Sequence, residues 1–311
     1  MSLSAGYLAL SPRFAEAIAA LAKRLSVQFD TNPRLSRALV CHQRWLLTQA
    51  CFALYADYAL RRLGPGCTAT SLSDWVVGEG VASRNTVHHF VESLRIYRFI
   101  RVAPDSPRRP LRYEICEQSL EAMHLWFGAN LAVLDYVDGG NRAERHQKQP
   151  DLLFRVQPEF ARRCMSNTNW REPSHRIGLL QWTECGALVM DEFLQLAVAA
   201  PVQNGFHDLG AVNIPAMAER FLMSRTHLQR TLKKAEEAGC IKRDGTRRGS
   251  HTFMAADFLQ EYCAWVAVKS AILDETFERV VASDEAIPAN SATGRISADH
   301  ATALTLQTLD Q

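Results

Sequence analysis

Two stretches of this 311-residue chain concentrate side chains that bind phosphate. Residues 83–113 contain seven arginines and two acids, a local charge of +5. Residues 224–251 contain eight bases and three acids, again +5. Because the whole chain carries only +2, the remainder carries −8. Positive charge gathered in two places on an acidic body favours a polyanionic partner.

Each stretch contains an amphipathic helix with its polar residues on one face. Ser83 and Ser224 are good N-cap residues, and apolar residues follow each of them at helical spacing. The inward residues are Val87, Val91 and Leu94 in the first helix, and Leu228, Leu232 and Ala235 in the second. The polar residues opposite them include Asn85, His88, His89 and Glu92 in the first helix, and Arg225, Thr226, Gln229, Arg230 and Lys233 in the second.

The two stretches are copies of one pattern. Ser83–Val87 and Ser224–Leu228 lie 141 residues apart, and Ile100 matches Ile241 at the same offset. A short apolar helical segment and a turn precede each amphipathic helix. A basic β-hairpin follows it, with strands expected at 99–102 and 111–115 in the first copy and at 240–243 and 251–255 in the second.

Helix, turn, helix and basic hairpin together resemble the winged helix-turn-helix domain of bacterial transcriptional regulators such as the MarR-like and GntR-like groups. The resemblance rests on the serine and apolar spacings above, and it covers about 45–50 residues in each copy, about a third of the chain. The pattern usually has a glycine where this chain has Arg98, and the second copy has Gly239 there. The resemblance implies that the second helix enters the DNA major groove and that the hairpin, or wing, lies on the backbone or minor groove.

That resemblance also assigns candidate DNA-binding residues. The base-facing set is Arg84, Asn85, His88 and His89 in the first copy, and Arg225, Thr226, Gln229 and Arg230 in the second, with Lys233 on the same face. The wing set is Arg101, Arg108, Arg109 and Arg112, and Lys242, Arg243, Arg247 and Arg248. Wing residues are expected on phosphates, where they supply affinity and register.

Long helices must position these two copies. Apolar spacing predicts helices at 12–29, 34–63, 118–137, 159–166, 184–199 and 258–281. The polar, breaker-rich segment 138–150 indicates a domain boundary. We therefore expect a mainly α fold of two winged helix-turn-helix halves, each with a small β-hairpin wing and flanking long helices. The expected divisions are 1–140 (winged-helix core 68–116), a linker at 141–157, 158–282 (core 208–256), and a weakly ordered tail at 283–311.

Other function classes lack a sequence signal. There is no nucleophile, phosphate-loop or dinucleotide motif, so we expect no enzyme activity and no cofactor. His88 and Glu92 are four residues apart, but no third ligand stands near them, so we expect no metal site. The six tryptophans are interpreted as core residues. Eight scattered cysteines and the lack of a signal or membrane-spanning segment favour a reduced, cytoplasmic protein without a membrane partner.

The leading hypothesis is a sequence-specific regulator of transcription that binds double-stranded DNA. Because the two polar helices differ, its site should be asymmetric. One alternative is a plasmid-type replication initiator, which resembles tandem winged helices. Another is a winged-helix scaffold that binds protein. The apolar helices at 12–29, 34–63 and 118–137 leave a homodimer open, and no residue marks a pocket for a small-molecule effector.

Overall fold

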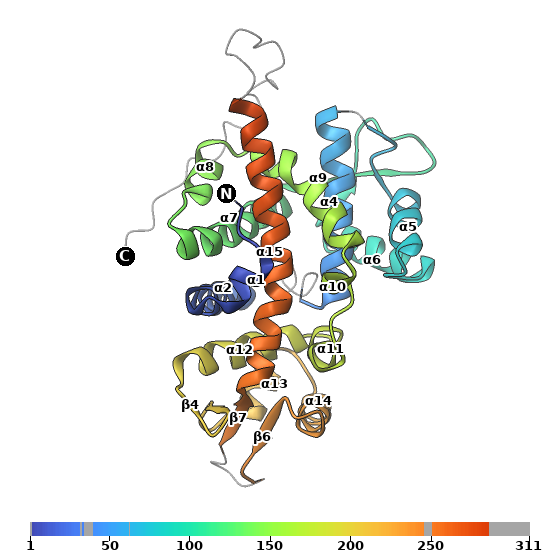
Figure 1. Cartoon of the computed structure of the whole chain (residues 1–311). Helices are drawn as coiled ribbons and strands as arrows, with labels where there is room; N and C mark the ends of the chain where they lie inside the picture. The colour runs from blue at the N-terminus through green and yellow to red at the C-terminus, as the bar shows by residue number, and fades with distance from the viewer. Residues whose placement is uncertain (1, 32, 34–39, 62, 246–250, 286–311) are drawn as a thin grey trace.

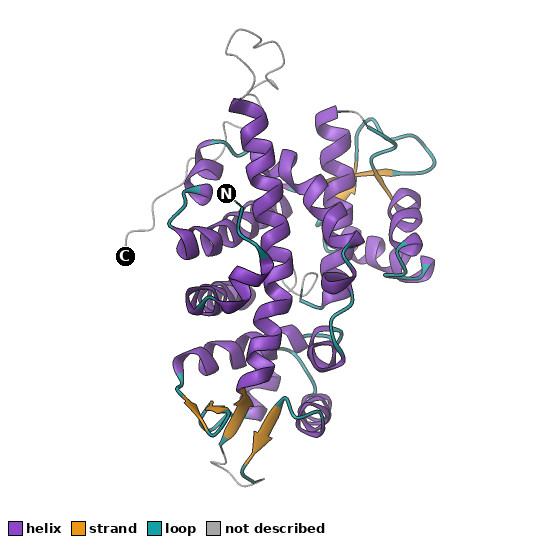
Figure 2. Cartoon of the chain, viewed as in Figure 1, coloured by secondary structure: helices purple, strands orange, loops and turns teal. Residues whose placement is uncertain are grey.

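A computed structural model describes residues 2–31, 33, 40–61, 63–245 and 251–285 (Figure 1). The described chain is mainly helical, with two small antiparallel sheets (Figure 2). Its first part contains α1 (Ala5–Leu10), α2 (Pro12–Thr31), α4 (His42–Arg61), β1 (Cys67–Thr68), α5 (Ala69–Gly78), α6 (Arg84–Ile96), β2 (Ile100–Val102), β3 (Arg112–Ile115) and α7 (Glu117–Asp138). The second part contains α8 (Arg142–Lys148), α9 (Leu152–Ser166), α10 (Thr168–Arg171), α11 (His175–Gln181), α12 (Gly186–Ala199), β4 (Val202–Gln203), β5 (Phe206–Asp208), α13 (Ile214–Arg220), α14 (Arg225–Glu237), β6 (Ile241–Arg243), β7 (Thr252–Ala255) and α15 (Ala256–Glu285).

The same order of elements occurs twice. A helix, a short strand, two helices, a hairpin and a long helix run from α4 to α7 and again from α12 to α15, where a second short strand, β4, precedes β5. The first sheet has the order β1-β3-β2, and the second has β4-β5-β7-β6. In both sheets the strand before the helix pair therefore lies next to the last strand of the hairpin. We call residues 67–115 the first unit and residues 206–255 the second unit.

Local sequence explains why α6 and α14 form at equivalent places. Each begins at a serine whose hydroxyl accepts a hydrogen bond from a backbone N–H three residues on, at 3.2 Å for Ser83 and 3.1 Å for Ser224. The predicted apolar residues of both helices are buried. Arg98 and Gly239 follow the two helices with φ of 59° and 70°, so the arginine adopts the left-handed conformation of its glycine counterpart.

One apolar core runs through both parts of the described chain. Helix α9 packs along α4, α2 packs against both α7 and α12, and α15 extends from the second unit past α1 and α7 (Figure 1). Phe29 of α2 meets Phe221, beside α13, edge to face, with ring centres 6.1 Å apart. The apolar faces of α2 and α7, which suggested a dimer surface, are largely used inside this core.

Most residues of the predicted linker at 141–157 are helical, because they form α8 and the beginning of α9. Gly139 ends α7 in a left-handed C-cap, with φ of 78°, so the breakers mark a helix end. Arg142 follows and is buried among carboxylates, with Asp138 at 2.8 Å and Asp274 of α15 at 2.7 Å. The polar character of the segment is explained in part by this ion pairing between Arg142 and α15.

The other predicted long helices are confirmed over most of their lengths. The helix predicted at 34–63 is described from His42 to Arg61, and that at 159–166 begins earlier, at Leu152. Of the predicted tail at 283–311, residues 283–285 belong to α15 and the rest lie outside the described residues. In the described part of the chain, no helix is both long and apolar enough to cross a bilayer.

Candidate nucleic-acid interface

Helix α14 presents a polar, basic face to solvent. Its inward residues Leu228, Leu232 and Ala235 are buried, which fixes the direction of the opposite side. The predicted outward residues are all exposed: Arg225, Thr226, Gln229, Arg230 and Lys233. Lys233 lies 3.8 Å from Glu237, and both side chains are mostly solvent-exposed. Within the described residues, Arg225 and Arg230 have no ion-pair partner.

A polar groove of about 470 Å³ lies along one side of α14, where it meets α11. Arg230 and Lys234 line it from α14, together with His227. His175 and the exposed Trp182 line it from the α11 side. Lys234 therefore belongs with the outward basic residues, although it is not among the candidates predicted from the sequence. Its position four residues after Arg230 was the available signal, because that spacing places both on adjacent turns.

The wing of the second unit has one exposed base among its described candidates. Lys242 is exposed, with its Nζ 6.0 Å from the ring centre of Phe206. Arg243 is half-buried and donates to Glu236 at 2.6 Å, so its charge is already paired within the unit. Arg247 and Arg248 lie outside the described residues. At the base of the wing, His251 is 2.9 Å from Asp208, which raises the pKa of the histidine.

Helix α6 presents a different outward face. Arg84, Asn85, His88 and His89 are all exposed, as expected for base-facing candidates. Arg84 lies 3.9 Å from Asp74 of α5. The same face carries Glu92, 141 residues before Lys233, and Glu92 pairs with Arg95 at 3.1 Å. An acid therefore occupies the position that is a lysine on α14.

The first wing corrects one prediction. Arg112 is buried, pairs with Asp105 and stacks over Tyr58, with its guanidinium carbon 4.2 Å from the ring centre. A side chain held in this way stabilises the unit and cannot also lie on a phosphate. Arg101 is exposed but pairs with Glu114 across the hairpin.

Three bases of the first unit remain without an ion pair to any described residue: Arg98, Arg108 and Arg109. Arg108 and Arg109 are exposed at the hairpin turn, as predicted for phosphate contacts. Arg98 is also exposed, beside the turn that ends α6, and it is not among the candidates predicted from the sequence. The surviving interface candidates thus gather on the two amphipathic helices and their hairpins.

Comparison with protein-family models, curated proteins and solved structures finds no match for this chain. The chemistry of the two units is consequently the basis for assigning a function. Fold alone would be insufficient in any case, since one fold serves many functions.

Proposed function

We propose that this chain binds double-stranded DNA through two winged helix-turn-helix units and regulates transcription. The observation that carries the proposal is the exposed face of α14, where Arg225, Gln229 and Arg230 stand without carboxylate partners among the described residues. An α-helix fits the major groove, and arginine and glutamine make paired hydrogen bonds with guanine and adenine there. The order of helices and hairpin around α14 supports this docking mode.

Phosphate contacts complete the proposed interface. Lys233 and Lys234 flank the base-facing residues on α14, and Lys242 lies on the following hairpin. Lysines at the edges of a recognition helix hold the protein on the DNA backbone and fix its register. In the first unit, Arg108 and Arg109 take the corresponding role on the wing. Since the outward faces of α6 and α14 differ, the target site is asymmetric.

Binding to a protein partner is disfavoured by the same charges. A groove of about 470 Å³ bordered by Arg230, Lys234, His175 and His227 suits an anionic backbone better than an apolar peptide. Desolvating several unpaired cations at a protein interface would be unfavourable without matching acids. We therefore favour DNA, a polyanion, over a protein as the binding partner.

The first test is selection of bound fragments from genomic DNA, followed by a salt series with the selected duplex. Contact with about six phosphates would weaken binding by about a thousandfold between 50 and 200 mM salt. The double variant Lys233→Ala/Lys234→Ala should reduce the slope of log affinity against log salt by about 1.8. The matched control is Lys23→Ala/Lys148→Ala, which removes two exposed lysines from α2 and α8 and should leave the slope unchanged.

Two results would overturn the proposal. One is the absence of binding to any duplex at 50 mM salt. The other is an equal change of slope in both double variants, which would mean that α14 is not at the interface. Enrichment of repeated origin sites together with strand opening would instead indicate replication initiation.

A further inference from the structure

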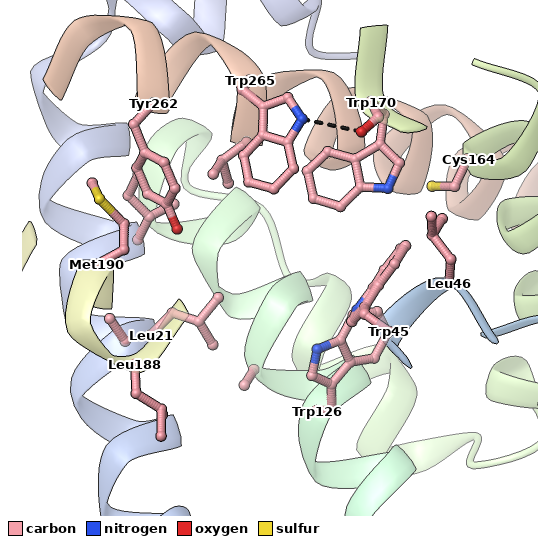
Figure 3. Close-up of a cluster of buried hydrophobic side chains, with 14 of the residues drawn as sticks. Leu21, Trp45, Leu46, Trp126, Cys164, Trp170, Leu188, Met190, Tyr262 and Trp265 are labelled. Carbon is pink, nitrogen blue, oxygen red and sulfur yellow. Dashed lines mark hydrogen bonds between the residues drawn. The ribbon is translucent and has the colours of Figure 1, made fainter. Parts of the chain in front are cut away.

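The helices that flank the two units line a partly open cavity of about 170 Å³. Figure 3 shows Trp45, Trp126, Trp170, Tyr262 and Trp265, which contribute to its lining. Its lining comes from α2, α4, α7, α10, α11, α12 and α15, so both parts of the chain contribute. The lining combines aliphatic residues with five large aromatic side chains, Trp45, Trp126, Trp170, Tyr262 and Trp265. A dry cavity of about 150 Å³ is known to hold benzene. The space therefore matches one six-membered ring with a small substituent.

A buried lysine gives this aromatic cavity a positive charge. Lys269 of α15 is only 8% exposed, and its Nζ donates to the side-chain oxygen of Asn130 at 2.6 Å. The same Nζ lies 5.7 Å from the ring centre of Trp126 and 5.9 Å from that of Trp170. Burial lowers the pKa of Lys269 to about 8, so the ammonium form still predominates at neutral pH. Among the described residues, Lys269 has no carboxylate within ion-pair distance.

Asp191 of α12 is the acid that lines the same cavity. Burial raises the pKa of Asp191 to about 7, against the opposing effect of Lys269. Its carboxyl group makes no hydrogen bond or ion pair with another described residue. At neutral pH it is therefore only partly ionised and leaves the buried ammonium incompletely balanced. A buried charge without a full counter-charge is unfavourable, and an incoming anion would relieve this.

We propose that the cavity binds a small aromatic carboxylate, with its ring among the tryptophans and its carboxylate on Lys269. A cationic ligand is disfavoured because Lys269 already occupies the faces of Trp126 and Trp170 and would repel it. A carboxylate without a ring would leave the indole surfaces unfilled. The ring supplies apolar contact, and the ammonium supplies orientation, as is usual for small-molecule pockets.

Tryptophan fluorescence tests this assignment without DNA, so its outcome is independent of the proposed function. The four probes are benzoate, benzamide, benzylamine and acetate. We expect benzoate to quench the fluorescence with a dissociation constant at least tenfold lower than that of benzamide. Benzylamine and acetate should give no saturable change up to about 10 mM, which corresponds to a binding free energy weaker than about −3 kcal/mol.

Variants separate the role of Lys269 from general folding. Lys269→Met should make the affinities for benzoate and benzamide equal. Asp191→Asn should still bind benzoate more tightly than benzamide. Lys148→Met, at an exposed site on α8, is the matched control and should leave every affinity unchanged. Circular dichroism and thermal melting establish that each variant is folded.

The pH dependence of the unmodified protein gives a readout that does not require a variant. The groups that face Lys269 are Asp191, Cys164 of α9 and His42 of α4. Burial raises the pKa of Cys164 and lowers that of His42 to about 4, so both stay neutral between pH 6 and 9. Benzoate affinity should therefore fall at least tenfold across that range, as Asp191 ionises and Lys269 loses its proton. Tighter binding of benzylamine, equal binding of benzamide, or no binding of any aromatic probe would overturn the assignment.

Discussion

The two units share a topology but differ in how they use their positive charge. In residues 83–113 of the first unit, four of the seven arginines lie within 4 Å of a carboxylate, namely Arg84, Arg95, Arg101 and Arg112. In the second unit, Arg225, Arg230, Lys234 and Lys242 have no ion pair to a described residue. The two stretches carry the same net charge in the sequence, but the second unit has more basic side chains that are free of an ion pair with a described residue. Copies of one element can keep the same scaffold while only one of them keeps an open basic face.

The difference suggests a division of labour within the proposed regulator. The second unit would supply most of the affinity and sequence discrimination, because its outward helix is basic and unpaired. The first unit would supply register and a weaker backbone contact through Arg108 and Arg109. Each prediction below contrasts matched changes in the two units or in the helices that flank them.

The largest difference in DNA affinity between matched variants should come from the exposed faces of α6 and α14. Arg225→Ala/Arg230→Ala should weaken DNA binding by at least about 30-fold, since each base-contacting arginine contributes about 1–3 kcal/mol. The matched variant Arg84→Ala/His89→Ala changes the equivalent positions of α6 and should cost less than about fivefold. Fluorescence anisotropy with one selected duplex at 100 mM salt measures both. Equal losses would mean that the two units contribute alike.

Acid should have opposite effects on the buried histidines of the flanking helices and on the histidine of the second unit. Burial lowers the pKa of His42 in α4 to about 4, and burial with the nearby His124 does the same for His146 in α8. The unfolded chain takes up these protons near pH 6.5, so the folded state loses stability as pH falls from 6.5 towards 4. By pH 5 the loss is about 2 kcal/mol for each histidine.

In the second unit, Asp208 raises the pKa of His251. That contact stabilises the fold fully below pH 6.5 and is lost as pH rises through the folded-state pKa. Urea unfolding at pH 7.5, 6 and 5 measures the net effect, and His146→Gln should remove about half of the acid loss. If the unfolding free energy of the unmodified protein does not fall between pH 7.5 and 5, or if His146→Gln leaves the fall unchanged, the assignment of the two buried histidines is contradicted.

Arg112 and Arg108 allow a buried and an exposed arginine of the first hairpin to be compared. Arg112→Met should lower the free energy of unfolding by about 2 kcal/mol, because it removes a charged hydrogen bond and a stacked contact from a buried site. The exposed neighbour Arg108→Met should stay within about 0.5 kcal/mol. Urea denaturation checks both values. If Arg112→Met instead reduced the salt slope of DNA binding without loss of stability, Arg112 would return to the phosphate-contacting set.

The smallest effect concerns the residue after each outward helix. Arg98 adopts a left-handed backbone, and Gly239 does so at the matched position with no atom within 4 Å of an added Cβ. Arg98→Gly should therefore stabilise the protein by about 0.5–1 kcal/mol, and Gly239→Ala should destabilise it by about 1 kcal/mol. Thermal melting resolves these opposite shifts, and shifts of the same sign would contradict the backbone equivalence.

Local sequence signals predict the outward helices and both hairpins well. The two serine N-caps, the apolar spacing and Gly239 each act within a few residues, so the sequence alone defines these elements. Strands β1 and β5 were missed because they are two and three residues long and form only by pairing with distant β3 and β7. Such strands have no periodicity of their own.

Long-range pairing also explains the remaining errors. The polar, breaker-rich segment 138–150 indicated a boundary and a linker at 141–157, but Arg142 of this segment pairs with Asp274 of α15, 132 residues further along the chain. Arg112 and Arg101 count as cations in the sequence, whereas Asp105 and Glu114 pair with them only in the folded unit. Lys269 gave no signal at all, because a lysine on an apolar helix is usually at its solvent face.

Helix α15 has a mechanical consequence for such a protein. It begins directly after β7 and continues without interruption past Lys269 to Glu285. At 1.5 Å per residue, the cavity-lining residues Tyr262 and Lys269 lie about 10 and 20 Å along the helix from the end of β7. A tilt of a few degrees at the tryptophans would displace the wing by about 1 Å. Any displacement of the cavity-lining part of α15 would therefore reach the second hairpin through one continuous helix.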